Sequence, residues 1–251
     1  MSINENKSYR TFVIGDIHGA CKALQQVIKR ARVNENDQLI FLGDYVDGWS
    51  QSFEVIQYLV DLEKRMKCIF IKGNHDVWCQ QWLEKKIPNQ TWLHNGGKAT
   101  FKSYLHRSQA DKLIHLQFFQ RMLNYYVDDD NRLFVHAGFS SMHGPYMEHF
   151  GSSYSWDRTL WEMALCMDPR IKKDDVLYPK RLKLFEEIYI GHTPTLRLGS
   201  FEPMNAVNVW NVDTSAGFNG SLSILDIDSK QFWQSNVVQL LYPDEPGRNS
   251  V

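Results

Sequence analysis

The stretch TFVIGDIHG, residues 11–19, begins with four residues that favour a β-strand and ends in a glycine turn that carries Asp16 and His18. The apolar residues that follow, from Leu24 to Ala31, recur at the spacing of one helix face. A strand that passes through a glycine turn into a helix is typical of an α/β fold. Because the turn follows the strand directly, its polar side chains are also the first candidates for a functional site.

The same order of strand, glycine turn and helix occurs twice more. Residues 38–42 and 68–72 are rich in β-favouring side chains, and helical apolar patterns follow them through Phe53 and through Trp78. Strands joined by helices in this order run in the same direction. The first half of the chain therefore predicts a parallel β-α-β-α-β sheet.

The second half of the chain is richer in strands. A helical middle runs from about Gly97 to Met122. The strands expected after it cover residues 133–136, 188–190, 206–212, 221–226 and 231–235, the last two as a hairpin. Together the two halves predict an α/β fold in which a central two-sheet β-sandwich is flanked by helices.

The length of the chain, 251 residues, is one that a single α/β domain with a substantial apolar core can hold. No internal repeat, low-complexity tract or Pro/Gly/Ser-rich linker divides it. We therefore expect one catalytic domain over residues 1–251, with a polar lead over residues 1–9 and a loose tail from about residue 243.

Composition and charge argue against several classes of protein. No apolar run approaches the roughly 18 residues that cross a bilayer. The 28 Lys and Arg against 29 Asp and Glu give no global positive field, so neither a nucleic acid nor a membrane is expected as a partner. Residues 1–10 lack the apolar stretch of a secretory signal, and a cytoplasmic location is therefore expected.

Polar side chains that can bind metal follow five of the expected strands. The segments are GDIHG (15–19), GDYVD (43–47), GNHD (73–76), VHAG (135–138) and IGHTP (190–194). Ligands in open α/β sheets gather at the carboxyl ends of the strands, so the first three should converge in one crevice. Glycine beside each polar group permits a sharp turn and leaves the approach to an ion open.

Taken singly these segments are weak signals, because Gly-Asp is a common turn and a lone histidine beside a strand is usually a core or surface residue. Together they supply Asp, His and Asn with almost no thiolate. That donor set suits Mn²⁺, Fe or Zn²⁺. The ordered set therefore predicts a metal centre.

The ordered motifs resemble those of the phosphoprotein phosphatase family, a branch of the calcineurin-like metallophosphoesterases. The resemblance extends from Gly15 to about Asp228. Many metallophosphoesterases end in Gly-His-x-His, whereas Pro194 stands here in place of the second histidine, which argues against nuclease and cyclic-nucleotide esterase activities. The segments 92–100 and 213–217 are similar to those of bacterial members, so the chain resembles a bacterial-type Ser/Thr protein phosphatase.

The resemblance implies two divalent metal ions, with manganese expected and iron or zinc as alternatives. The residues it assigns are Asp16 and His18 for one ion, Asn74, His136 and His192 for the other, and Asp44 as the bridge. Two neighbouring cations repel, so a carboxylate and a hydroxide between them are needed. The bridging hydroxide would attack phosphorus directly, without a phosphoenzyme.

The resemblance also implies a proton donor for the leaving group, His75, oriented by Asp47. A carboxylate beside a histidine favours the imidazolium form and fixes its tautomer. The alternative is that His75 only supports the loop around Asn74.

One departure from the family concerns the arginines that bind the phosphate of the substrate. The family usually has an arginine after the residue that matches Asp47, but this chain has Gly48-Trp49. A second family arginine corresponds to Arg158, whose guanidinium could bind phosphate oxygens; a surface ion pair is the alternative. Trp49 either fills the space beside Gly48 or belongs to the core.

The expected activity is hydrolysis of phosphomonoesters, first of all phosphoserine or phosphothreonine in proteins. The alternatives are diadenosine tetraphosphate hydrolysis, a broad small-molecule phosphatase and, from another class, a metal-bound binding protein with weak or no turnover. The sequence shows no evident basic cluster for a polyphosphate. Its tryptophans, among them Trp78 and Trp92, are expected to pack in the core rather than to stack on a nucleobase.

Overall fold

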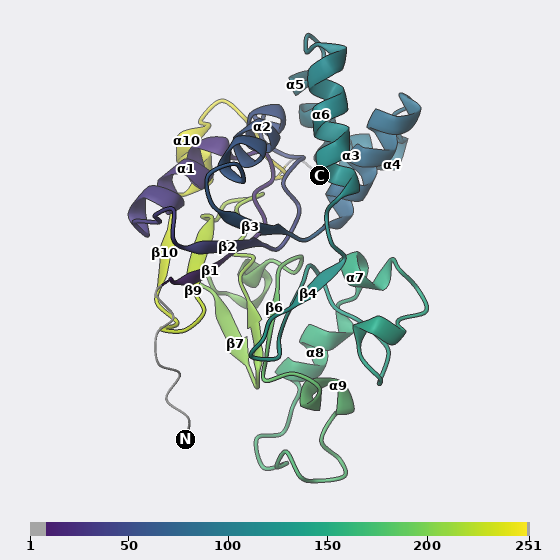
Figure 1. Cartoon of the computed structure of the whole chain (residues 1–251), viewed down its shortest axis with the longest axis vertical. Helices are drawn as coiled ribbons and strands as arrows, with labels where there is room; N and C mark the ends of the chain where they lie inside the picture. The colour runs from purple at the N-terminus through teal and green to yellow at the C-terminus, as the bar shows by residue number, and fades with distance from the viewer. Residues whose placement is uncertain (1–8, 250–251) are drawn as a thin grey trace.

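The computed structural model describes residues 9–249 and contains two five-stranded sheets (Figure 1). The first sheet has the order β10-β9-β1-β2-β3 and the second the order β4-β5-β6-β8-β7. The strands of the first sheet are β1 (Thr11–Ile14), β2 (Gln38–Phe41), β3 (Lys67–Phe70), β9 (Ser223–Asp226) and β10 (Phe232–Gln234). Those of the second are β4 (Tyr125–Val127), β5 (Arg132–Val135), β6 (Glu187–Ile190), β7 (Met204–Ala206) and β8 (Val209–Asn211).

The parallel core of the first sheet has the predicted arrangement. β1 pairs with β2, and β2 with β3, both in parallel, and the register aligns Thr11 with Gln38 and Gln38 with Lys67. β9 and β10 form the predicted hairpin, and β9 adds to β1 in antiparallel orientation. The carboxyl ends of β1, β2 and β3 therefore meet at one edge, where three of the glycine turns begin.

Side chains alternate across each sheet and so build separate layers of core. In β1, Phe12 and Ile14 join the cluster beneath the helices, while Val13 joins the cluster between the two sheets. In the second sheet Phe134 stacks on Tyr189 between the sheets, with ring centroids 5.0 Å apart. Because both faces of β1 and β2 are buried, these strands occur in the sequence as short runs of β-favouring residues and not as an alternation of polar and apolar ones. The predicted two-sheet sandwich with flanking helices is confirmed.

Helices cover the outer face of each sheet (Figure 1). Those beside the first sheet are α1 (Cys21–Arg30), α2 (Ser52–Leu62), α3 (Asn74–Lys85), α4 (Gln90–Trp92), η1 (Leu93–Gly97), α5 (Lys98–Ser103), α6 (Gln109–Gln120) and α10 (Val238–Leu241). Those beside the second are η2 (Pro145–Met147), α7 (Ser153–Trp156), α8 (Thr159–Leu165), α9 (Lys180–Lys183) and η3 (Thr195–Leu198).

The structure differs from the predicted elements in three places. The helical middle is divided, because Ser108 caps a new helix by accepting a hydrogen bond from Asp111 N at 3.1 Å. The strand predicted at 206–212 is instead the β7–β8 hairpin, whose turn places the β-branched Val207 at φ +56°. β4 was not predicted. A valine at positive φ carries no turn signal, so the sequence pattern conceals this hairpin.

The C-terminal segment is not the loose tail that we expected. The carboxylate of Glu245 accepts hydrogen bonds from Ser50 N at 2.9 Å and Ser50 Oγ at 2.6 Å, and Arg248 N donates to Gly217 O at 2.9 Å. The partners of this segment are distant in the sequence, so they could not be recognised from it. The local composition, which is polar with Pro and Gly, suggested a free end instead. Residues 1–8, in the expected polar lead, and residues 250–251 lie outside the described part of the chain.

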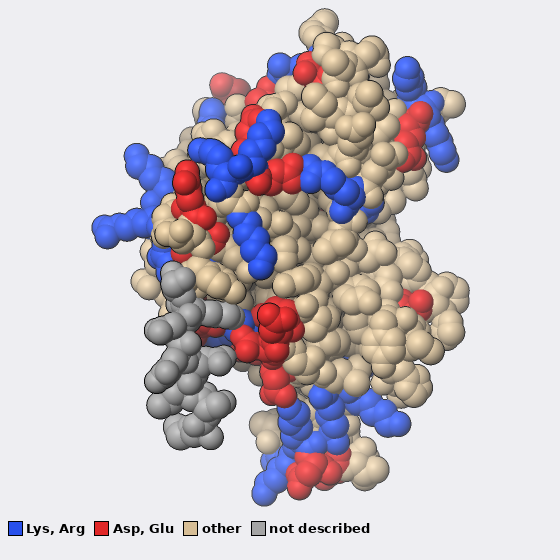
Figure 2. Space-filling view, in the orientation of Figure 1, with Lys and Arg blue, Asp and Glu red and all other residues tan. Residues whose placement is uncertain are grey.

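Charges of both signs are interspersed on the face shown in Figure 2, in keeping with the net charge of −1. Within residues 9–249, none of the helices has the length and apolarity that crossing a membrane requires.

Candidate metal centre

The six residues predicted to bind metal come together at the edge where the glycine turns meet. Five of them follow strands: Asp16 and His18 follow β1, Asp44 follows β2, His136 follows β5 and His192 follows β6. The sixth, Asn74, begins α3. Asp16, His18, Asp44, Asn74, His136 and His192 are all at most 7% exposed. Burying two carboxylates among imidazoles is costly unless positive charge balances them, which makes the group suited to cations.

Asp44 lies at the middle of the group. Its Oδ2 is 3.4 Å from His136 Nε2, 3.8 Å from His18 Nε2 and 4.0 Å from His75 Nε2. Asp44 also belongs to both three-residue sets whose donor atoms lie close enough to share an ion, one with His18 and His75 and one with His136 and His192. A carboxylate common to two such sets has the position that a bridging ligand needs.

The remaining predicted ligands flank Asp44 on its two sides. Asp16 Oδ2 is 3.9 Å from His18 Nε2, and Asn74 Oδ1 is 3.2 Å from His136 Nε2. Asp16 thus lies beside His18, and Asn74 lies beside His136. Asp16 also accepts hydrogen bonds from His192 N at 3.2 and 3.1 Å, and the division of the ligands between two ions stays a prediction.

Backbone contacts aim the histidine nitrogens at this centre. Nδ1 of His18 is 3.1 Å from Val46 O, and Nδ1 of His136 is 2.7 Å from Leu42 O. A carbonyl can only accept, so each Nδ1 donates its proton to the backbone, which leaves Nε2 as the ring nitrogen available to a metal ion. His192 Nε2 is buried and has no hydrogen-bond partner among the described residues. The residues present therefore fit divalent metal ions.

Strained backbone and two glycines make room for the carboxylates. His18, Asp44, Asp47 and His192 have φ values of 51°, 53°, 74° and 65°, and such conformations cost about 1–3 kcal/mol each. A Cβ at Gly73 would lie 2.1 Å from Asp44 Oδ1, and a Cβ at Gly191 would lie 2.1 Å from Asp16 Oδ1. These glycines are required because the carboxylates pass directly over the backbone.

The electrostatics of the centre follow from burial and close opposite charges. Burial raises the pKa of Asp16 well above its usual range, and the nearby Asp213 raises it further. Burial also acts to raise the pKa of Asp44, but His136 and His75 outweigh it and hold that pKa well below its usual range. Conversely, burial lowers the pKa of His136, while Asp44 and Asp16 raise it to about 10. Positive charge beside Asp44 thus stabilises its carboxylate.

His75 and Asp47 form a buried pair at the side of this centre. His75 Nδ1 lies 2.7 Å from Asp47 Oδ2, and Asp47 also accepts hydrogen bonds from Trp92 Nε1 at 2.7 Å and from Thr100 Oγ1 at 2.6 Å. Burial raises the pKa of Asp47 to about 8, against the hydrogen bonds from Thr100 and Trp92, and burial lowers the pKa of His75 to about 3. Burial thus acts against the charged form of both groups, and the 2.7 Å contact between them is the interaction that opposes this effect.

The sequence did not predict that Trp92 and Thr100 donate hydrogen bonds to Asp47. Asp76 was missed too: its carboxylate accepts from Gly73 N at 2.8 Å, Asp44 N at 2.7 Å and Tyr45 N at 3.0 Å, and so joins two of the glycine turns. An acidic residue in the first turn of α3 was the available signal, because such residues often cap a helix.

A cavity of about 170 Å³ opens onto the centre. Asp44, Asn74, His75 and His192 line it, together with the arginines Arg158, Arg197 and Arg248. The expectation of no basic cluster is thus wrong, because three arginines distant in the sequence converge here. Trp78 and the partly exposed Trp156 also line the cavity, with ring centroids 5.3 Å apart, so Trp78 is not simply a core residue.

Arg158, the predicted phosphate contact, lies in this cavity. Its Nε is buried without a hydrogen-bond partner, and within residues 9–249 its side chain forms no ion pair. Burial and the nearby Arg197 lower its pKa. Trp49, by contrast, is fully buried and donates from Nε1 to Ala216 O at 2.7 Å, so it belongs to the core.

Known proteins resemble the chain along most of its length. It is 26% identical over 235 residues to serine/threonine-protein phosphatase 1 of Salmonella typhimurium, which covers 89% of this chain and 94% of that protein. It is 28% identical over 233 residues to the asymmetrical bis(5'-nucleosyl)-tetraphosphatase PrpE of Anoxybacillus flavithermus, which covers 85% of this chain and 88% of that protein.

Two solved structures share the fold at low sequence identity. A cold-active protein-tyrosine phosphatase of a Shewanella species has a TM-score of 0.56 and 15% identity over 90% of this chain and 80% of its own. A protein serine/threonine phosphatase from Saccharomyces cerevisiae has a TM-score of 0.57 and 13% identity over 92% of this chain and 81% of its own. Residues 9–216, most of the chain, match the family described as calcineurin-like phosphoesterase, and the chain therefore belongs to the calcineurin-like metallophosphoesterases.

Proposed function

We propose that this metallophosphoesterase is a phosphatase that hydrolyses phosphomonoesters, with phosphoserine and phosphothreonine of proteins as its substrates. In the proposed site Asp16 and His18 hold one divalent ion, Asn74, His136 and His192 hold the other, and Asp44 bridges them. Manganese is the ion that we expect, with iron and zinc as alternatives that the same donors accept. Such ions neutralise phosphate charge and make hydroxide available near neutral pH.

The observation that carries the choice of a phosphomonoester is the buried pair of His75 and Asp47. Nδ1 of His75 is engaged by Asp47, so only Nε2, 4.0 Å from Asp44 Oδ2, faces the reaction centre. A serine or threonine alkoxide is a very poor leaving group and must gain a proton as its bond to phosphorus breaks. His75 can supply that proton from Nε2, and Asp47 orients the ring and stabilises its charged form.

A second candidate function is hydrolysis of a bis(5'-nucleosyl) tetraphosphate. It is favoured by the three arginines and by the indole rings of Trp78 and Trp156 around the cavity, which can contact several phosphates and a base. The leaving group of that reaction is itself a phosphate, whose second ionisation occurs at a pH of about 6, so it needs less help from an acid. The dedicated pair at His75 therefore favours the phosphomonoester.

The experiment is a comparison of substrates on protein that has been chelated and then reloaded with Mn²⁺. The panel contains phosphoserine and phosphothreonine peptides, diadenosine tetraphosphate and nitrophenyl phosphate. We expect the highest kcat/KM on a phosphopeptide and no turnover after chelation. A higher kcat/KM on the dinucleotide would transfer the assignment to the second candidate. Absence of turnover on every member, with metal bound, would support a binding protein instead.

A further inference from the structure

Position 48, where the family carries an arginine, disfavours any side chain in this structure. Gly48 has φ +111°, a conformation that side chains other than glycine rarely adopt. A Cβ built there would lie 3.0 Å from Arg248 Cγ and 3.4 Å from His18 O. The space beside Asp47 that the missing side chain would use is therefore filled by Arg248, which comes from the other end of the chain.

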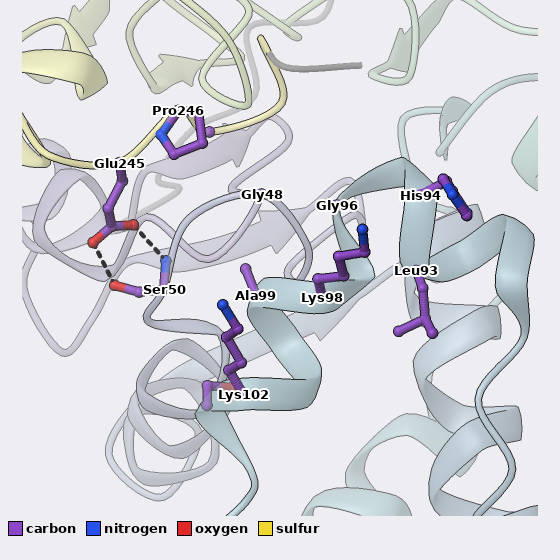
Figure 3. A pocket seen from close by; sticks show the side chains of 12 residues that line it. Gly48, Ser50, Leu93, His94, Gly96, Lys98, Ala99, Lys102, Glu245 and Pro246 are labelled. Carbon is purple, nitrogen blue, oxygen red and sulfur yellow. Dashed lines mark hydrogen bonds between the residues drawn. The ribbon is translucent and has the colours of Figure 1, made fainter.

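The C-terminal segment is attached to the body of the protein in the positions just before Arg248. The carboxylate of Glu245 accepts hydrogen bonds from Ser50 N at 2.9 Å and from Ser50 Oγ at 2.6 Å (Figure 3). Gly247 has φ +59°, and a Cβ there would lie 2.6 Å from Trp49 Cζ2, so the backbone rests directly on that ring. Residues 245–247 also form one wall of a cavity of about 600 Å³ that Gly48 borders.

The side chain of Arg248 extends from the C-terminal segment to His18 at the metal centre. It passes between Gly48 and Gly217, and a Cβ at Gly217 would lie 3.2 Å from Arg248 Cδ. Its Cζ lies 4.9 Å from the centroid of the Phe218 ring, a cation–π contact, and its Nη1 lies 3.0 Å from His18 Nε2. Two glycines and one aromatic ring thus leave room for this side chain.

Among residues 9–249 the guanidinium of Arg248 has no acidic partner. Within residues 9–249 it forms no ion pair, and its Nε is buried without a hydrogen-bond partner. Arg132, by comparison, pairs with three carboxylates, those of Asp128, Asp130 and Asp228. An arginine held in a partly buried cavity without a counter-charge indicates that an anion from outside completes the site.

We propose that Arg248 binds the phosphate of the substrate, in place of an arginine at position 48. This inference rests on the proposed function, since the anion is the phosphoryl group of a phosphoester. Arg158 and Arg248 line the same cavity, and both have a buried Nε without a partner. Together they can bind phosphate oxygens as two planar forks.

In this structure Arg248 Nη1 lies 3.0 Å from His18 Nε2, the nitrogen that is expected to bind a metal ion. The Nε2 of His18 has a single lone pair, so a metal ion and the guanidinium compete for it. With an ion on His18, Arg248 must turn its Nη1 elsewhere, and the adjoining cavity is the space that it lines.

The test uses the full-length protein loaded with Mn²⁺ and measures the affinity for inorganic phosphate by calorimetry beside the KM for a phosphopeptide. Arg248→Ala should weaken phosphate binding by about 10- to 100-fold, the range expected for hydrogen bonds to a charged group, with metal content unchanged. Arg248→Lys should restore part of the loss, because it keeps the charge and loses the fork. Asn249→Ala, which alters the next residue of the same segment, is the matched control and should bind phosphate as the wild type does.

A second measurement uses Glu245, which holds the C-terminal segment on Ser50 and does not itself contact the metal centre. Glu245→Ala should weaken phosphate binding only because it releases Arg248, so the double variant with Arg248→Ala should bind phosphate no more weakly than Arg248→Ala alone. Additive losses would show that Glu245 acts by another route.

Unchanged phosphate affinity in Arg248→Ala, with both metal ions bound, would overturn the proposal. Tighter metal binding together with unchanged phosphate affinity would assign Arg248 a role as competitor of the metal at His18 instead. Phosphate binding that depends on Arg248 in a protein that hydrolyses no ester would contradict the proposed function and leave the anion site in place.

Discussion

Nδ1 of His75 lies 2.7 Å from Oδ2 of Asp47, and neither side chain is more than 3% exposed. This contact leaves Nε2 of His75 as the only ring nitrogen that can reach a leaving group. His75→Asn should therefore reduce turnover of a phosphoserine peptide by about 10²–10⁴-fold and reduce turnover of nitrophenyl phosphate less, because nitrophenolate leaves without a proton. Steady-state kinetics on the two substrates measure the difference.

Metal content is the control for this variant, because His75 follows Asn74 and a displaced loop could imitate the loss of an acid. Equal losses on both substrates, with two ions still bound, would assign His75 a supporting role only.

Trp92 should matter to catalysis through its hydrogen bond to Asp47. Trp92→Phe removes the Nε1 donor and keeps most of the ring, so we expect a loss that is smaller than that of His75→Asn and shows the same dependence on the leaving group. Trp82→Phe is the matched control, because Trp82 packs on Trp92 with centroids 5.4 Å apart and is not bonded to Asp47. If both variants lose the same activity, packing and not the hydrogen bond is responsible.

Arg158 should contribute to the binding of substrate and not to the binding of metal. Arg158→Ala is expected to raise KM and lower kcat/KM by about 10- to 100-fold, as for the loss of hydrogen bonds to a charged group, while metal content stays unchanged. The exposed Arg65 offers a control substitution, Arg65→Ala, away from the cavity. Kinetics of Arg158→Ala that match those of this control would show that the cavity binds phosphate without Arg158.

His115 should make stability depend on pH. Burial lowers its pKa from the ordinary 6.5 to about 4 in the folded protein, where its Nδ1 lies 2.8 Å from the hydroxyl of Tyr104. The unfolded chain thus takes up a proton at higher pH than the folded one. The contribution is complete above pH 6.5 and is lost as the pH falls from 6.5 through 4, by about 3 kcal/mol at 1.36 kcal/mol per pKa unit.

Urea unfolding of the wild type and of His115→Gln between pH 7 and pH 4 measures this effect. The variant should lose less free energy of unfolding over that interval than the wild type. Parallel curves for the two proteins would show that His115 does not contribute to the dependence.

The parallel strands and the convergence of side chains around Asp44 could be predicted from the sequence for a physical reason. β1 and β2 are short runs of β-favouring residues that are buried on both faces, and each is followed by a glycine turn, so local residues specify both the strand and the place of its polar group. The same reasoning brought His136 and His192 to the centre, because each follows a strand of the second sheet.

Contacts between distant segments could not be predicted in this way. Arg248 lies at the metal centre in a segment held by contacts of Glu245 with Ser50 and of Arg248 N with Gly217 O. Trp92, in α4, bonds to Asp47, which is 45 residues earlier. The three arginines of the cavity, Arg158, Arg197 and Arg248, are far apart in the sequence, so no local run of basic residues indicates that they converge. Val207 at positive φ conceals a hairpin for the same reason: its conformation is imposed by the sheet and not by its own preference.

One measurement tests most directly the proposal that Asp44 bridges two metal ions. Chelated protein is titrated with Mn²⁺ while bound metal and turnover are followed together, for the wild type and for Asp44→Asn, with the exposed Asp61→Asn as control. We expect two ions per wild-type chain, with turnover appearing as the second binds, and weakened binding of both ions with almost no turnover in Asp44→Asn. Two tightly bound ions and near-normal turnover in Asp44→Asn would contradict the account.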